Sequence, residues 1–291
     1  MLYIDLNNNK SFWLNKILLL NGNEEDFIME YQKIKLSISE GIGNIVLNGP
    51  KNYNAMNGLM ITEINSALDA CASDWNVKVV VISGEGKAFC SGGDIAEMVK
   101  GLQKGELVKF RTSLDESADV VKKIRNIDKP VIASVHGAAA GAGFNLALAC
   151  DFRIVADNSK FIQAFVQVGL VPDMGGIYFL SKLVGYARAT DLCMTGREML
   201  ADEALALGLV NKVVTVEALE EETIKFAKTL SEGPGASYAK TKDLINKTEF
   251  NDFDEHLTAV SQYQIQSAMT TDFQEGITAF MQKRKPEFQG R

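Results

Sequence analysis

Two short runs of small residues are the stretches of this sequence best suited to chemistry, Phe89–Gly93 and Gly137–Gly143. Each run follows an apolar segment that is typical of a buried strand, and each leads into a helix. Small residues leave backbone N–H groups accessible, and the first N–H groups of a helix have no partner within it. Such a turn can hold an anion, or an oxyanion that develops during a reaction.

The two runs predict a single site if the strands before them are neighbours in one sheet. Both turns then emerge on the same side, and the N–H groups of Gly93 and Ala142 can point at one oxygen, as in an oxyanion hole. The alternative is that Gly and Ala residues only let a helix pack tightly on a strand. For the second run alone, the sequence favours neither interpretation.

Nucleotide-binding motifs do not fit these glycines. Gly137, Gly141 and Gly143 follow the spacing G-x-x-x-G-x-G, whereas the dinucleotide fingerprint is G-x-G-x-x-G. Gly86-Lys87 is followed by Ala88 and lacks the earlier glycine of a phosphate P-loop. Both nucleotide interpretations are therefore disfavoured.

The composition narrows the class of protein. The chain has 291 residues, 46% of them hydrophobic, which suits one large domain or a domain with an appendage. A formal net charge of -7 argues against a nucleic-acid partner. The four cysteines show no paired spacing and the chain has only two histidines, so we expect reduced thiols, no metal site and a cytoplasmic protein. We expect no redox or other separate cofactor.

The N-terminal residues 1–28 differ from the rest of the chain. They are Asn-rich, and their apolar patch at Phe12–Leu20 is too short for a membrane span. Glu24-Glu25 corresponds to a purine-rich codon pair at the distance of a ribosome-binding sequence from Met29. We hypothesise that Met29 is the native start and that residues 1–28 are a non-native or disordered extension. Intact-mass measurement of protein made from the native gene tests this, and a product beginning at Met1 would contradict it.

The order of expected elements predicts an α/β protein with a helical C-terminal third. The expected strands are Tyr31–Ser37 and Gly43–Leu47 as a hairpin that turns at Gly41 and Gly43, then Val77–Ser83, a strand from Pro130, Phe152–Ala156 paired with Lys160–Ile162, and Leu209–Val214. The expected helices are Asn57–Asp74 with Asn57 as its cap, 106–127, one after Gly143, one ending at Val184, and helix from Glu217 onward, broken at Gly233–Gly235.

Taken together, the motifs resemble those of the crotonase (enoyl-CoA hydratase/isomerase) superfamily over about residues 30–288. The segments that carry the resemblance are Leu47–Lys51 with Asn54-Ala55, Ala88–Ile95, His136–Asp151, Gly169–Asp173, Thr195-Gly196, Ala201–Val210, and Ala279-Phe280 with Lys283–Lys285.

The resemblance implies a fold, an assembly and a ligand. The fold is a spiral of β-β-α repeats over residues 29–230, with a helical trimerisation region over 231–291. The assembly is a homotrimer or a hexamer, and the ligand is an acyl-CoA thioester, with coenzyme A as part of the substrate. Gly93 and Ala142 would hold the thioester oxygen as an enolate. The other residues expected to contact substrate or CoA are Asn54, Ala55, Gly92, Asp94, Ile95, Gly141, Phe165, Phe280 and Lys283, the last two commonly serving a neighbouring subunit.

The sequence departs from the family at both hydratase glutamates. These positions hold Asn145 and Phe165, neither of which can act as a general acid or base. One carboxylate remains, Asp173 in Val171-Pro172-Asp173, and this pattern looks like the single-Asp isomerase branch, which includes ring-epoxide and Δ3,Δ2-enoyl-CoA isomerases. Asp173 is also placed as a helix cap, a role that would favour its ionised form. Asn145 is expected to bind substrate or orient Asp173, with bonding to nearby backbone as the plainer alternative.

Three hypotheses follow from these residues and the resemblance. The first is an acyl-CoA isomerase that uses Asp173 as its one acid/base. The second is another crotonase reaction through the same enolate, such as hydration, a different lyase step or thioester hydrolysis. The third is an acyl-CoA binding protein without catalysis.

Overall fold

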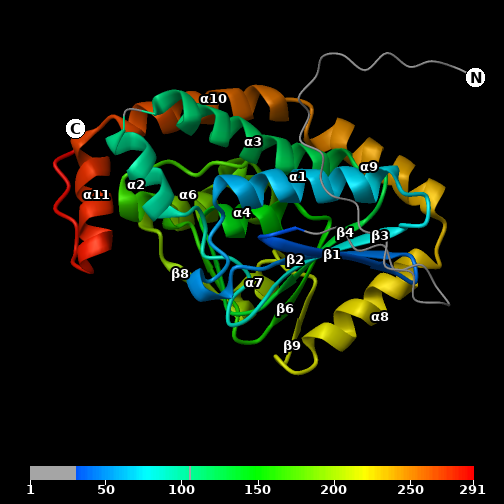
Figure 1. Ribbon diagram of the computed structural model, residues 1–291. Coiled ribbons are helices and arrows are strands. Elements are labelled where there is room, and N and C mark those ends of the chain that lie inside the picture. The colour runs from blue at the N-terminus through cyan, green and yellow to red at the C-terminus, as the bar shows by residue number, and fades with distance from the viewer. Residues whose placement is uncertain (1–30, 105) are drawn as a thin grey trace, which may run out of the picture.

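The structure is a computed structural model that describes residues 31–104 and 106–291 (Figure 1). The hypothesis about residues 1–28 lies outside the described residues and stays a prediction. Strands and helices alternate through the first two thirds of the described chain, and helices alone follow Val214, so the predicted α/β class is confirmed.

A six-stranded sheet forms the centre of the fold, with strands in the order β1-β2-β3-β4-β6-β9. Its strands are β1 (Ile34–Ser39), β2 (Ile42–Leu47), β3 (Val79–Gly84), β4 (Val131–Val135), β6 (Phe152–Ala156) and β9 (Lys212–Val214). All neighbouring pairs are parallel except β1 and β2. A smaller sheet pairs β7 (Lys160–Ile162) with β5 (Ala138–Ala140) and β8 (Glu198–Leu200).

Eleven α-helices and two short 3₁₀ helices surround the sheets in the described residues. The α-helices are α1 (Gly58–Ser73), α2 (Ile95–Gln103), α3 (Leu107–Asn126), α4 (Ala142–Ala149), α5 (Gly176–Val184), α6 (Tyr186–Thr195), α7 (Ala201–Ala206), α8 (Leu219–Ser231), α9 (Gly235–Glu249), α10 (Phe253–Ala268) and α11 (Thr271–Gln282). The 3₁₀ helices are η1 (Pro50–Asn52) and η2 (Ala164–Val168). None of the helices that the structure describes is both long and apolar enough to cross a bilayer.

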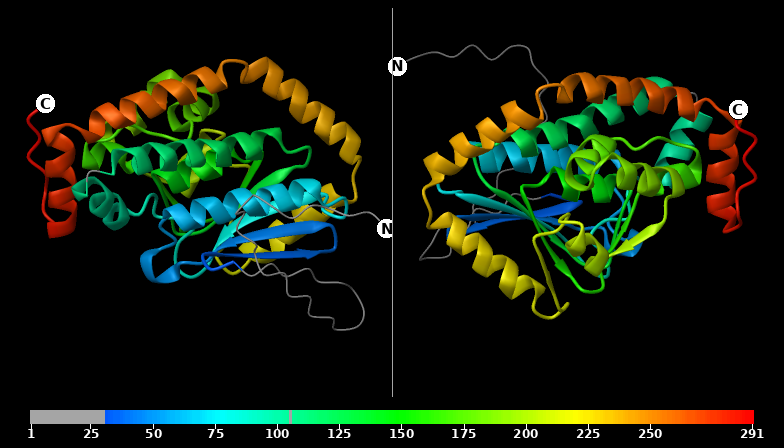
Figure 2. Two further views of the ribbon diagram at one scale, coloured as in Figure 1. Left: turned by 45° about the horizontal axis from the view of Figure 1, so that its top comes forward. Right: turned by 180° about the vertical axis from the view of Figure 1, so that it is seen from behind.

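Helices bury both faces of the central sheet, which explains why β3 is apolar at every position from Val79 to Ile82 (Figure 2). Val80 and Ile82 face the main core, which includes side chains of α1, α3 and α4. Val79 and Val81 face the opposite side, where Leu219 and Ala227 of α8 cover them. Parallel strands buried in this way end at a common edge, and the loops that leave β3 and β4 there build the site.

The predicted hairpin forms, but both strands extend further toward the turn than expected, so only two residues connect them. Glu40 and Gly41 make the turn, both with positive φ, and Gly43 lies inside β2 opposite Ile38. A Cβ on Gly43 would lie 2.7 Å from the Cys71 sulfur on α1. The glycine is therefore needed for the close approach of a helix and not for the turn.

The prediction that Phe152–Ala156 pairs with Lys160–Ile162 is wrong. Both segments are strands, but β6 has β4 and β9 on its two sides, so no edge is left for β7. The chain crosses over instead, and the Lys160 N–H donates to the Gly137 carbonyl at 2.8 Å at the start of β5. The second small-residue run, predicted as a turn throughout, therefore contains the short strand β5.

A buried ionic cluster holds the C-terminal helices against the core. Asp151 accepts from Arg125 on α3 at 2.8 Å and from Lys242 on α9 at 2.7 Å. Both basic side chains are only 9% exposed. Burial lowers the pKa of Lys242, and the charge of Asp151 opposes that effect. Through this cluster α9 is fixed to the loop that follows α4.

Candidate active site

The two small-residue runs lie against each other beyond the ends of β3 and β4, which are neighbours in the sheet. The Cys90 N–H donates to the Ala138 carbonyl at 3.0 Å, and the Ala140 N–H donates to the Cys90 carbonyl at 2.9 Å. The predicted convergence of the two runs is therefore confirmed. Burial raises the pKa of the Cys90 thiol to about 12, so this thiol is not an available nucleophile at neutral pH.

Glycine is needed where the two runs touch. A Cβ on Gly143 would lie 2.5 Å from the Cys90 carbonyl oxygen. Gly92 has a φ of +103°, and a Cβ there would lie 3.0 Å from the Ala140 oxygen and 3.7 Å from the Ala142 nitrogen. The packing interpretation of these small residues is therefore correct for Gly92 and Gly143, and it is compatible with a role for the free N–H groups nearby.

The N–H of Gly93 has no hydrogen-bond partner among the described residues. The peptide groups on either side of it are bonded to Met56, whose N–H donates to the Gly92 carbonyl at 2.8 Å and whose carbonyl accepts from Asp94 at 2.9 Å. This bonding pattern uses the groups that flank Gly93 and leaves its own N–H free.

The N–H of Ala142 is also free among the residues that the structure describes. Ala142 is the first residue of α4, and Gly141 before it adopts a φ of 49° and a ψ of -122° without any side chain that caps the helix. The positive end of the α4 dipole therefore adds to the field at this donor. Gly141 in turn is held by its own N–H, which donates to the Ile162 carbonyl at 2.8 Å.

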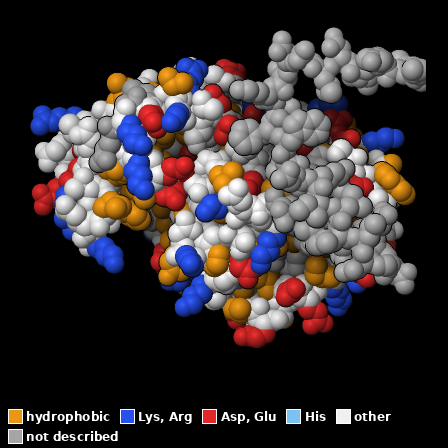
Figure 3. All heavy atoms as spheres, in the orientation of Figure 1, with side chains coloured by type: hydrophobic (Ala, Val, Ile, Leu, Met, Phe, Trp, Pro, Cys, Tyr) orange, Lys and Arg blue, Asp and Glu red, His pale blue; other side chains and the backbone are white. Residues whose placement is uncertain are grey.

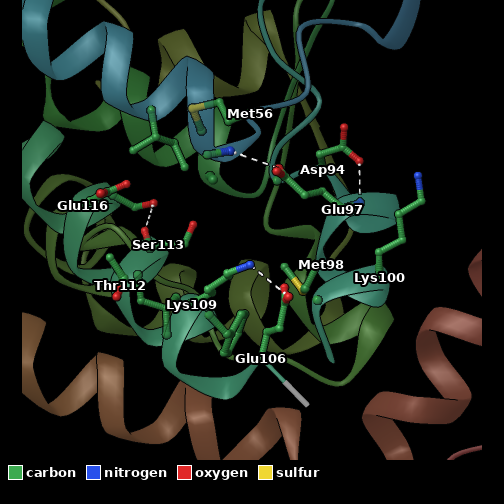
Figure 4. Close-up of a pocket in the computed structure, with 18 of the residues that line it drawn as sticks. Met56, Asp94, Glu97, Met98, Lys100, Glu106, Lys109, Thr112, Ser113 and Glu116 are labelled. Atoms are coloured by element: carbon green, nitrogen blue, oxygen red, sulfur yellow. Dashed lines mark hydrogen bonds and ion pairs between the residues drawn. The ribbon is translucent and has the colours of Figure 1, made fainter. Parts of the chain in front are cut away.

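Gly93, Ala142 and Asp173 line one cavity of about 520 Å³ between α2, α3 and the start of α1 (Figure 4). This volume is in the range of small-molecule sites. Apolar side chains line much of it, among them Met56, Ile61, Met98, Phe110 and Leu114. Charged residues also line it, namely Asp94, Glu97, Glu106, Glu116, Lys100, Lys104 and Lys109. In Figure 3, basic side chains stand beside apolar ones on the left of the molecule, over α2 and the start of α3.

Asp173 presents one oxygen of its carboxyl group without a partner. Its Oδ2 accepts from the Gln264 amide Nε2 at 3.1 Å, while Oδ1 is buried and has no hydrogen bond in the described structure. Burial raises the pKa of Asp173 to about 7, although the Gln264 bond and the residue's own N–H act in the opposite direction. A carboxyl group with this pKa can exchange a proton near neutral pH.

The alternative interpretation of Asp173 as a helix cap is wrong, because its side chain does not cap α5. Helix α5 begins later, at Gly176, after Gly175 with a φ of 72°. The Gly176 N–H donates at 2.9 Å to the backbone carbonyl of Asp173 and not to its carboxylate. Without N–H donors from a helix terminus, the effect of burial dominates and the pKa rises.

Asn145 lies beneath Asp173 and is fully buried. Its Nδ2 donates to the Asp173 backbone carbonyl at 2.8 Å, and its Oδ1 accepts from Gln163 at 2.7 Å. A Cβ on Gly176 would lie 2.4 Å from the Asn145 amide, so the turn after Asp173 packs directly on this side chain. Of the two roles predicted for Asn145, this placement favours orienting Asp173, through its backbone, over contact with substrate.

Phe165 packs against Gly141 of the second small-residue run and is not among the residues that line the cavity. It is 8% exposed, and its ring lies 3.6 Å from the position that a Cβ on Gly141 would occupy. The second hydratase position therefore holds an apolar ring directly behind Gly141. The expected contact of Phe165 with substrate stays a prediction.

The expected contact of Asn54 with CoA stays a prediction, and the described hydrogen bonds of its side chain are all made within the protein. Asn54 is fully buried; its Oδ1 accepts from the Gly49 N–H at 2.8 Å. Its Nδ2 donates to the carbonyls of Glu85, Ala88 and Phe89 at 2.9, 2.8 and 3.2 Å. All of its hydrogen-bonding capacity is used to join two loops. Ala55 beside it is partly exposed, and its predicted contact with CoA stays open.

Asp94 and Ile95 mark the start of α2. The Asp94 Oδ1 accepts from the Glu97 N–H at 3.1 Å, which is an N-terminal cap (Figure 4). Glu97 in turn accepts from the Gly58 N–H at 3.0 Å and so ties α2 to the start of α1. Ile95 is the first residue of α2 and, unlike Asp94, does not line the cavity.

Phe280 and Lys283 lie at the end of α11 and do not line the cavity of their own chain. Phe280 is 58% exposed, and Lys283 ends the helix with a φ of 53°. Arg284 next to it is already paired with Glu275, at 2.8 Å for Nη2–Oε2. The predicted contacts of Phe280 and Lys283 with CoA in a neighbouring subunit stay a prediction.

Gln264 is the site residue that sequence reasoning missed. It lies on α10, 91 positions after Asp173, so no local motif joins the two. A signal was present nonetheless. The buried residues of α10 are Phe253, Leu257, Val260, Gln264 and Ala268, and the glutamine is the one polar member of this helical stripe.

Comparison with known proteins shows what the whole chain is similar to. Residues 37–291 match the model of the enoyl-CoA hydratase/isomerase family. The chain is 37% identical over 267 residues to a trans-2-decenoyl-[acyl-carrier-protein] isomerase of Streptococcus mutans, covering 90% of this chain and 100% of that protein. It is 32% identical to a 1,2-epoxyphenylacetyl-CoA isomerase of Escherichia coli, covering 87% and 97%. A crystal structure of an enoyl-CoA hydratase from Mycobacterium avium subsp. paratuberculosis superposes with a TM-score of 0.81 at 34% identity, covering 89% and 99%.

The fold is that of a crotonase-type α/β protein, as the resemblance implied. The chain belongs to the enoyl-CoA hydratase/isomerase family. Both isomerases and hydratases occur among its relatives, so the family alone does not choose between the two reactions.

Proposed function

We propose that this protein is an acyl-thioester isomerase that moves a carbon–carbon double bond, with Asp173 as its only acid/base. One observation carries the proposal. The partnerless Oδ1 of Asp173 belongs to a residue that lines the same cavity as the free N–H groups of Gly93 and Ala142. A carboxylate and two converging donors are what a reaction through a thioester enolate requires.

The reaction would be a 1,3-proton shift on a 3-enoyl thioester. Asp173 Oδ1 takes the proton from the carbon between the carbonyl and the double bond. The electron pair of the broken C–H bond gives a dienolate, whose oxygen accepts hydrogen bonds from Gly93 and Ala142. The same proton then returns from Oδ1 to the far carbon of the double bond, and the product is the conjugated 2-enoyl thioester. A pKa of about 7 suits both halves, because the group must be a base first and an acid second.

Hydration of an enoyl thioester is the second candidate, and one observation favours it. Glu116 on α3 lines the cavity and makes no ion pair among the described residues, so it offers a second carboxylate. The two positions at which the family's hydratases carry glutamates nevertheless hold Asn145 and Phe165, and both are buried away from the cavity. Isomerisation needs only the carboxylate that is already next to the donors.

The substrate carrier and the assembly are finer parts of the same proposal. We expect a CoA thioester, because Lys100, Lys104 and Lys109 at the cavity can attract phosphate groups, although Lys109 is also paired with Glu106 at 2.9 Å. A thioester on an acyl carrier protein and a ring-epoxide substrate are the alternatives that the names of two relatives suggest. Assembly as a homotrimer or hexamer stays a prediction.

Chromatography with mass spectrometry on a 3-enoyl-CoA incubated with the protein tests the proposed function. We expect a product of unchanged mass and new retention time. A gain of one water would instead support hydration and direct attention to Glu116. Binding of the thioester without any conversion would support a binding protein that lacks catalysis.

A further inference from the structure

The carboxyl group of Asp173 is held from a distant part of the chain, by helix α10. This helix packs along α3 (Figures 1 and 2), and α3 contributes residues to the lining of the cavity. Gln264 on its inner face is 1% exposed and donates to Asp173 Oδ2 at 3.1 Å. Nothing else among the described side chains donates to either oxygen of this carboxyl group.

The glutamine is poorly explained by stability alone. Its Oε1 is buried and has no partner in the described structure, which disfavours the folded state. The neighbouring positions of the stripe are the apolar residues Val260 and Ala268, and an apolar side chain at 264 would complete it without an unpaired oxygen. A buried amide that is only half satisfied, and whose satisfied half contacts a cavity carboxylate, points to a role at the site.

We propose that Gln264 is a positioning residue that occupies Oδ2 of Asp173 and so reserves Oδ1 as the single atom that receives and returns the proton. This inference rests on the proposed function, because it concerns the same carboxyl group. Rotation of the carboxyl group would exchange its two oxygens, and the hydrogen bond from the Gln264 amide to Oδ2 opposes that rotation. The Asn145 side-chain amide donates to the backbone carbonyl of Asp173. The backbone of Asp173 is therefore held by Asn145 and its carboxyl group by Gln264.

The Gln264 hydrogen bond also affects the charge of the group it holds. An amide N–H stabilises the carboxylate over the neutral acid, and it therefore counteracts the rise in pKa that burial causes. Other ionisable residues around Asp173 are those that line the cavity, Asp94, Glu97, Glu106, Glu116, Lys100, Lys104 and Lys109, together with His256 on α10, whose ring lies against Tyr178. None of these forms a hydrogen bond or ion pair with Asp173 among the described residues.

Gln264→Met tests the inference, because methionine is similar in length and fits an apolar stripe but donates no hydrogen bond. With a 3-enoyl-CoA as substrate, we expect kcat to fall about 10- to 100-fold, as misplacement of a reacting group does, with little change in KM. The acid limb of the kcat profile should move to higher pH, because the carboxylate loses its donor. Gln266→Met is the matched control: Gln266 is on the same helix but exposed, and this variant should behave like the wild type.

Three comparisons keep the test decisive. Gln264→Leu, a second apolar side chain that donates nothing, should move the acid limb in the same direction even if the methionine variant folds poorly. Wild-type kcat and pH profile in both variants would overturn the inference. If Asp173→Asn abolishes turnover while Gln264→Met does not alter it, only this inference fails. If Asp173→Asn remains active, the proposed function fails with it.

Discussion

Asp173→Asn should lower the rate of isomerisation by about 10²- to 10⁴-fold, the usual contribution of a general acid/base. Asparagine has the shape of aspartate and can still accept from Gln264, but it cannot take up a proton at Oδ1. The N–H donors of Gly93 and Ala142 remain, so affinity for the thioester should change little. The measurements are kcat on a 3-enoyl-CoA and exchange of its α-proton with D₂O. In the wild type, kcat should rise with pH and level off above about 7, because the ionised carboxylate starts the reaction.

The stability of the same variant shows whether lost activity is a folding defect. Because the folded-state pKa of Asp173 is raised, the native protein holds a proton that the unfolded chain loses above about pH 4. The free energy of unfolding of the wild type therefore decreases between about pH 4 and pH 7, and above pH 7 the whole of this decrease is present. It reaches up to about 4 kcal/mol, since each pKa unit corresponds to about 1.4 kcal/mol.

Asp173→Asn should remove this pH dependence and leave the protein at least as stable as the wild type at pH 8. Urea unfolding at pH 5 and pH 8 measures the difference. Two results would contradict our account of the site: α-proton exchange that survives the substitution, or a variant that is markedly less stable than the wild type at pH 8.

Asp151→Ala should reduce the free energy of unfolding by about 3–5 kcal/mol, the usual cost of removing one partner from a buried ion pair. The substitution leaves the Arg125 guanidinium and the Lys242 ammonium buried side by side. It also removes the acceptor of the Val131 N–H, which donates to Asp151 Oδ2 at 2.8 Å at the start of β4. Burial already lowers the pKa of Lys242, so in this variant Lys242 should lose its proton more easily. At high pH the variant should therefore lose less unfolding free energy.

Asp243→Ala provides the matched control on the same helix. Asp243 is the neighbour of Lys242 in sequence, but its pair with Lys247 is exposed, with side chains 54% and 70% accessible. Pairs of this kind contribute about 0.3–0.5 kcal/mol. Equilibrium unfolding in guanidinium chloride compares the two variants. If both variants lose the same small amount of unfolding free energy, the buried cluster does not hold α9 to the core.

The placement of the two small-residue runs could be predicted, because each follows an apolar strand and only one strand pairing is needed to bring them together. Apolar strands followed by small-residue turns lie at Phe89–Gly93 and Gly137–Gly143, and the pairing of β3 with β4 brings the two turns together. The family resemblance supplied Asp173, and the structure places that residue at the cavity together with both donors. The helix after Asn57 could also be predicted from the sequence, because its start depends on the residue type at position 57. The Asn57 side chain caps the helix by accepting from the Met60 N–H at 2.9 Å.

What could not be predicted depends on contacts between distant segments. Gly43 looks like a turn residue until the Cys71 sulfur is placed next to it. Asn54 gives no sign in the sequence that its side-chain amide donates to three carbonyls of residues 85–89. Whether Asp173 is ionised depends on the burial of its carboxyl group and on Gln264, 91 residues away.

The free donors of this cavity belong to the main chain, and this has an evolutionary consequence. Most codon changes at positions 93 and 142 alter a side chain and keep the N–H; among the standard amino acids only proline deletes it. Selection on these groups therefore acts mainly through the glycines that allow the close approach, such as Gly92 and Gly143. Acid and base groups are side chains and can change, as positions 145 and 165 illustrate, where Asn and Phe stand in place of the two hydratase glutamates. A lineage can in this way exchange one reaction for another while it inherits the same means of stabilising an enolate.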